Sequence, residues 1–77
     1  MDKFGIKKAI QEIADGHVVK MESEDFKTHL FYKSKNGIGK PIIHMVRRSV
    51  GRPLDLHLTY DEFKKKFAEN KFYIYES

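Results

Sequence analysis

Three histidines are the residues of this chain whose type and spacing best suit metal binding. His29, His44 and His57 fall in three strand-like segments, and the pairing expected for these segments places them side by side. Imidazoles on adjacent strands can share a metal ion, and three of them leave one position open, as in catalytic zinc sites. No carboxylate is placed as a base, and the spacing matches no metal motif. We therefore favour ordinary histidines lining a half-buried face, with no metal or other cofactor.

Cations and aromatic rings surround the same segments. The cations lie at two loops expected at opposite ends of the sheet, so they would bracket a strand of nucleic acid that crosses the face between them. Aromatic and imidazole rings on that face would stack against bases. The candidate binding residues are the cations Lys33, Lys35, Lys40, Arg47, Arg48 and Arg52, and the rings Phe31, His44, His57, Tyr73 and Tyr75. The simpler alternative is a solvated rim of charge.

Composition agrees with such a binding surface without requiring it. The 77 residues carry a formal charge of +4, which favours nucleic acid or an acidic protein surface, although solubility alone favours a charge of this size. Hydrophobic residues make up 40%, as in globular proteins. Cys is absent, which excludes disulfides and Cys-zinc sites and suits a cytoplasmic protein. The size and composition would suit a small gene of a phage or other mobile element. No apolar run approaches the roughly 20 residues of a membrane span, and the first residues lack a signal peptide's apolar core.

Enzymatic motifs are not evident. The segment from Lys35 to Lys40 combines glycines with lysines but lacks the Walker spacing, and a hairpin turn explains it better. The serines have no His-Asp arrangement. We therefore expect a non-enzymatic binding or regulatory module that contacts nucleic acid. The alternative is a protein-interaction module, either an inhibitor or a homodimer, that buries Phe31, Ile42 and Val46 against its partner.

Two helices must support these segments. Residues 3–15 have apolar residues at helical spacing, and Gly16 suits a left-handed C-cap. The second helix begins at Thr59, where Thr59 and Glu62 form a capping box and Leu58 and Phe63 a hydrophobic staple. Asn70 can end this helix.

Five strands complete the prediction, over residues 17–22, 27–33, 40–48, 53–58 and 71–76. The order α-β-β-β-β-α-β predicts one two-layer α+β domain over residues 1–77, with a four- to five-strand antiparallel meander. The last strand lies either beside the first or beside the fourth in parallel.

Two turns define an expected register. A two-residue turn at Asn36-Gly37 pairs His29 with His44, and a four-residue loop at 49–52 pairs His44 with His57. Opposed residues share a face. The resulting core face contains Leu30, Tyr32, Ile43, Met45, Leu54, Leu56 and Leu58. The other face contains His29, Phe31, Ile42, His44, Val46, Asp55 and His57, and it stays open for binding if both helices cover the core face.

Overall fold

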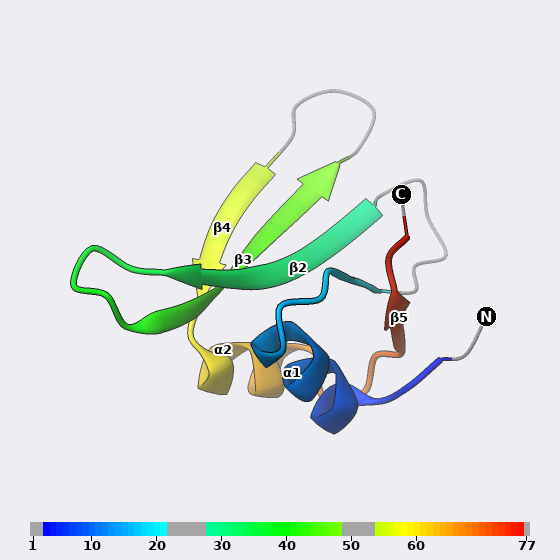
Figure 1. Cartoon of the computed structure of the whole chain (residues 1–77). Coiled ribbons are helices and arrows are strands. Elements are labelled where there is room, and N and C mark those ends of the chain that lie inside the picture. The colour runs from blue at the N-terminus through cyan, green and yellow to red at the C-terminus, as the bar shows by residue number, and fades with distance from the viewer. Residues whose placement is uncertain (1–2, 22–27, 49–53, 77) are drawn as a thin grey trace.

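The computed structural model describes residues 3–21, 28–48 and 54–76 and confirms the α+β fold (Figure 1). Two helices and a five-strand antiparallel sheet follow one another in the predicted order. Within the described ranges, no helix is long and apolar enough to cross a membrane. The elements are α1 (Ile6–Ala14), β1 (Val19–Met21), β2 (Thr28–Lys35), β3 (Pro41–Arg48), β4 (Leu54–Leu58), α2 (Tyr60–Lys66) and β5 (Phe72–Ile74).

The helix boundaries follow local chemistry. The predicted capping box at α2 is present: the Glu62 backbone N–H donates to Thr59 Oγ1 at 3.1 Å, and the Thr59 N–H donates to Glu62 Oε1 at 3.1 Å. These bonds satisfy two backbone donors that a helix start leaves unpaired. After α1, Gly16 has φ 95°, the left-handed conformation expected of a residue that follows a helix. The helix α2 ends at Lys66, earlier than the predicted end at Asn70.

The strand order is β4-β3-β2-β1-β5. The first four strands therefore form the predicted meander, and β5 takes the first of its two expected positions, antiparallel to β1. Beyond β5, Phe4 exchanges two backbone hydrogen bonds with Phe72, each of 2.8 Å. The N-terminal residues thus cover part of the outer edge of β5.

The predicted register between β2 and β3 is wrong by three residues. Lys35 pairs with Pro41, so the loop holds five residues. A type I′ turn needs positive φ at Asn36 and Gly37, but neither has it, and Gly39 supplies the positive φ, at 84°. The side chain of Asn36 organises the loop, because its Oδ1 accepts the backbone N–H groups of Ile38 and Lys40 at 3.0 and 2.9 Å.

This shift exchanges the faces of β2, because a slip by an odd number of residues moves every side chain to the other side. Phe31 and His29 lie on the core face, whereas Leu30 and Tyr32 lie on the opposite face. The register predicted between β3 and β4 is confirmed, with Ile43 opposite Leu58 and His44 opposite His57. The Arg52 position and the loop 49–52 lie outside the described residues.

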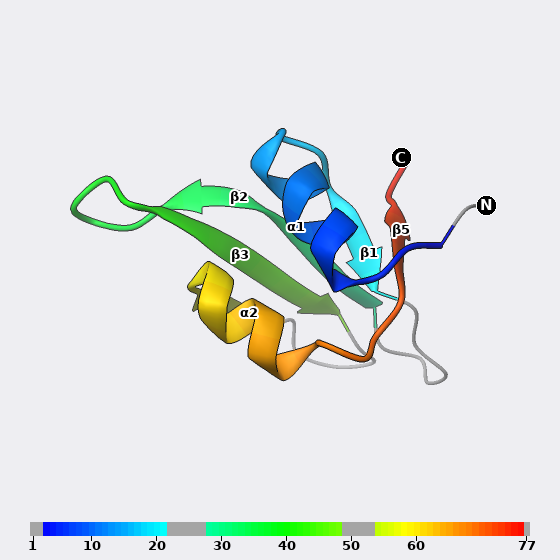
Figure 2. The ribbon, with the colours of Figure 1, turned by 90° about the horizontal axis from the view of Figure 1, so that it is seen from below.

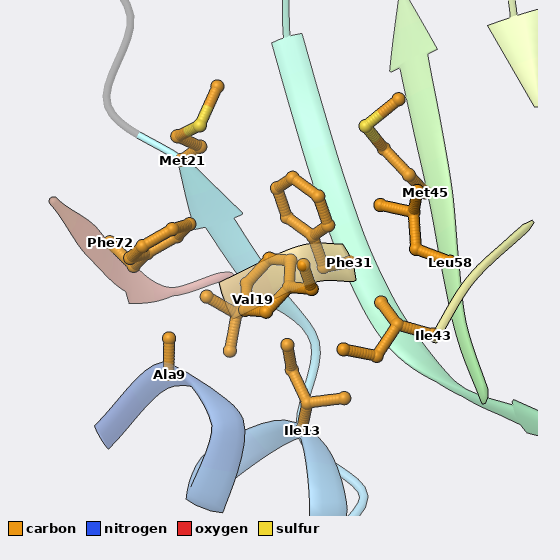
Figure 3. Packing of buried hydrophobic residues seen from close by; sticks show 10 residues of the cluster. Ala9, Ile13, Val19, Met21, Phe31, Ile43, Met45, Leu58 and Phe72 are labelled. Carbon is orange, nitrogen blue, oxygen red and sulfur yellow. The ribbon is translucent and has the colours of Figure 1, made fainter. Parts of the chain in front are cut away.

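Both helices pack on one face of the sheet (Figure 2). Phe31 is fully buried at the centre of this core (Figure 3), with its ring edge-on to Phe63 at 4.9 Å, Phe67 at 5.3 Å and Phe72 at 6.0 Å between centroids. Burial of a phenylalanine is worth about 1.5–3 kcal/mol relative to exposure. The opposite face of β2, β3 and β4 has no helix among the described residues, and we call it the open face.

Candidate nucleic-acid interface

A row of three rings crosses the open face. Tyr32 on β2, His44 on β3 and His57 on β4 are directly opposed neighbours. The ring centroids of Tyr32 and His44 are 4.8 Å apart and those of His44 and His57 are 4.6 Å apart, with planes tilted by 38° and 34°. The rings therefore lie side by side across three strands, as neighbours in a sheet do when their side chains share one face. We call these three residues the ring row.

Polar contacts hold the centre of the row. Tyr32 Oη lies 2.8 Å from His44 Nδ1, and His44 Nε2 lies 3.4 Å from Asp55 Oδ1. If the tyrosine O–H donates to Nδ1, the imidazole N–H is at Nε2 and faces the Asp55 carboxylate. The second contact is electrostatic, because Nε2 forms no well-aligned hydrogen bond. The His44 side chain is 20% exposed and the Asp55 side chain 63% exposed, so the carboxylate is available to further partners.

The predicted three-histidine row is wrong in one member. His29 pairs with Arg47 and points to the helix-covered side, whereas Tyr32 occupies the expected place beside His44. No group of three or more potential metal-ligating side chains occurs in the described part of the chain. The prediction that Phe31 is an exposed binding residue is also wrong, because its side chain is fully buried in the core. The register error accounts for both corrections.

The three lysines of the first loop lie on a projecting arm. The strand β1 pairs with β2 only as far as Phe31, and β4 pairs with β3 only from Ile43 onward. The hairpin from Tyr32 to Ile42 therefore extends beyond its neighbouring strands and past both helices (Figures 1 and 2). Lys33, Lys35 and Lys40 are exposed on this hairpin, which we call the basic arm. At its tip, Ile38 is 78% exposed.

The other candidate residues are not gathered at this arm. Arg47 is half-buried near the opposite end of β3, and Arg48 pairs with Thr28 there. Tyr73 lies on β5, separated from β2 by β1, with Lys20 Nζ 5.7 Å from its ring centroid. Tyr75, 39% exposed, lines a shallow hollow of about 610 Å³ with Tyr73 and Lys20. Because the same hollow also contains Glu12 and Glu76, its cations are balanced by carboxylates.

Charge along the chain is strongly segregated, and this signal is visible in the sequence alone. Residues 26–54 contain seven of the 15 Lys and Arg residues and none of the 11 Asp and Glu residues. The remainder carries eight cations and all 11 acidic residues, so a segment of +7 is joined to a remainder of −3. The basic segment includes the whole of β2 and β3. The β2–β3 hairpin is therefore strongly basic, although the net charge of the whole chain is modest.

No protein-family model, curated protein or solved structure matches this chain, so its function has to be argued from these residues.

Proposed function

We propose that the protein is a non-enzymatic nucleic-acid-binding module whose basic arm contacts the phosphate backbone and whose ring row contacts bases. The observation that carries this proposal is the segregation of charge: the projecting β2–β3 hairpin belongs to a segment with seven cations and no acidic residue. Phosphate neutralisation by Lys and Arg supplies most of the non-specific affinity for nucleic acid.

The shape of the arm suits this role. A two-stranded β-ribbon fits the major groove of B-form DNA. The arm is such a ribbon, and Lys33, Lys35 and Lys40 are its exposed cations. Lys33 and Lys35 lie two and four residues after Phe31, so both project to the same side of the ribbon as Phe31. Lys40 lies in the loop. The arm therefore presents cations both along the side opposite the ring row and at its loop.

The ring row has a different role because of Asp55. An exposed carboxylate beside His44 repels phosphates from the middle of the open face. Rings bind bases through stacking and edge contacts that require no positive charge. We therefore assign phosphate binding to the arm and base contacts to the exposed parts of Tyr32 and His57.

A second candidate is binding to a protein through the same open face. Its support is the cross-strand pair of Leu30 and Val46, which are both only half-buried on the open face. Ile42, expected from the sequence to contact a partner, is only 8% exposed and gives no such support. Apolar pairs of this kind on an uncovered sheet face are typical of interaction surfaces when they are contiguous. This module would bind without dependence on the basic arm.

A salt-dependent titration separates the two candidates. Fluorescence anisotropy would measure binding of labelled single- and double-stranded oligonucleotides from low to physiological salt. We compare the wild type with Lys33→Gln/Lys35→Gln/Lys40→Gln and with the matched control Lys64→Gln/Lys65→Gln/Lys66→Gln, which removes equal charge from α2. For the arm variant with duplex, the slope of log affinity against log salt should fall by about 0.9 for each lysine that contacts a phosphate.

The control should keep most of the wild-type slope. Equal losses in both variants would mean that only net charge matters and would contradict the role of the arm. No binding at low salt would reject the nucleic-acid proposal and leave the protein-binding candidate.

A further inference from the structure

The two edge strands of the sheet differ in whether another segment pairs with their outer side. The edge strand β5 has three residues, and Phe4 pairs with it from outside. The opposite edge strand, β4, has five residues, and no described residue pairs with its outer side. Natural proteins usually protect an open edge with a very short strand, charged side chains (above all lysine), proline, a bulge or a covering segment. Within Leu54–Leu58 there is neither lysine nor proline, and the single acidic residue, Asp55, is two positions from His57.

The sequence of β4 is complementary to a second, antiparallel copy of the same strand. The strand is Leu54-Asp55-Leu56-His57-Leu58, with leucines on the helix-covered side and the two ionisable side chains exposed on the open face. If two copies of this strand pair antiparallel about Leu56, Asp55 of each copy faces His57 of the other. Leu54 of each copy then faces Leu58 of the other. Each carboxylate gains an imidazole N–H donor, and each leucine gains an apolar neighbour.

Neighbouring registers lack this match. Centring the pair on Asp55 places the two Asp55 carboxylates opposite each other, and centring it on His57 places the two imidazoles opposite each other. A shift by one residue would bring the leucines of one copy to the face that carries Asp55 and His57 in the other. Opposite charges stabilise a cross-strand pair and like charges destabilise it. The sequence of β4 therefore selects one register.

We propose that the protein forms a two-fold symmetric homodimer in which β4 pairs antiparallel with β4 of a second copy, centred on Leu56. The partner surface is the same strand on each copy, which is how a two-fold interface is built. The pairing satisfies the outward backbone groups of both edges and joins two five-strand sheets. The two open faces become one surface with a ring row on each side of the axis. This inference does not depend on nucleic-acid binding.

Charge reversal with complementation tests the interface. Sedimentation velocity would measure association of the wild type, of Asp55→Lys and of His57→Asp. In each variant alone, both cross-strand pairs become like-charged or unfavourable, and association should weaken about tenfold or more. An equimolar mixture of the two variants pairs the introduced lysine with the introduced aspartate and keeps the native contact between Asp55 and His57 at the other position, so heterodimers should form. Loss of the contact between Asp55 and His44 within one copy would not be repaired by mixing, which separates the two effects.

A disulfide tests the register. The chain has no cysteine, so a single introduced thiol reports on one position. Only the residue on the two-fold axis faces itself, with Cα atoms about 4.5–5.5 Å apart, within disulfide range. Oxidation should cross-link Leu56→Cys and not the matched control Leu54→Cys, while circular dichroism checks that both fold.

Three results would overturn the proposal: a wild type that stays monomeric at the highest soluble concentration, charge variants that associate like the wild type, or a mixture that fails to associate. Equal cross-linking of both cysteine variants would reject the register. Each of these outcomes is independent of the oligonucleotide titration, so failure of the dimer is distinguishable from failure of the proposed function.

Discussion

Phe31 and Tyr32 are consecutive residues of β2 that experience opposite environments. The Phe31 ring is fully buried among the rings of Phe63, Phe67 and Phe72, beneath the helices. The Tyr32 ring lies on the open face and makes a hydrogen bond with His44. The comparison teaches that aromatic content alone does not mark a binding surface in a small sheet, because alternate residues of one strand serve the core and the surface.

The two faces also differ in what holds them together. The helix-covered face is stabilised by burial of apolar area, and its cluster of buried side chains contains no polar residue. The open face is organised by directional contacts through the ring row and Asp55. Substitutions should therefore have large effects on stability on the first face and small effects on the second.

The largest effect is expected from Phe31→Ala. Removal of a buried phenylalanine typically costs about 3–5 kcal/mol, which is a large part of the stability of a small domain. Tyr32→Ala is the matched control and should cost clearly less, because part of its side chain is already in water. Urea unfolding followed by circular dichroism would measure both. Equal losses at the two positions would contradict the assignment of the faces.

A smaller effect is expected from Thr59→Ala, which removes the cap that begins α2. The hydroxyl accepts the Glu62 N–H at 3.1 Å, and loss of such a cap costs about 1 kcal/mol. Because α2 carries Phe63 into the core, the loss should appear as a lower urea midpoint for the whole domain. Thr59→Ser keeps the hydroxyl and should restore most of the stability. If both variants unfold alike, the capping bond is not the cause.

The smallest effect is expected from Tyr32→Phe, which removes only the hydroxyl next to His44. A hydrogen bond of this kind contributes about 0.5–1.5 kcal/mol, and partial exposure places this one near the lower end. The imidazole resonances of His44 should shift in NMR spectra while those of His17, whose partner is Glu12, stay unchanged. Unchanged His44 resonances would show that the contact does not organise the ring row.

The candidate site was only partly predictable. His44 and His57 are opposed as predicted, because the register derived from a four-residue loop at 49–52 is the one observed between β3 and β4. The lysines around the first loop are exposed as expected. Tyr32 was missed and Phe31 wrongly chosen, because the loop after β2 was predicted three residues too short. The alternation of β2 could not correct this, since aromatic or apolar residues occupy both of its faces.

The sequence by itself determined the elements that depend on neighbours in the chain. The Thr59–Glu62 capping box, the glycine after α1 and the order of helices and strands all follow from contacts within a few residues. Only the tertiary structure decided the face of Phe31, the length of the Asn36 loop and the place of β5. The face of Phe31 and the place of β5 depend on packing between distant segments, because the helices and β5 bury one face of β2 rather than the other. The Asn36 loop is held by local side-chain hydrogen bonds, but its length also fixes the register between β2 and β3, which that packing decides.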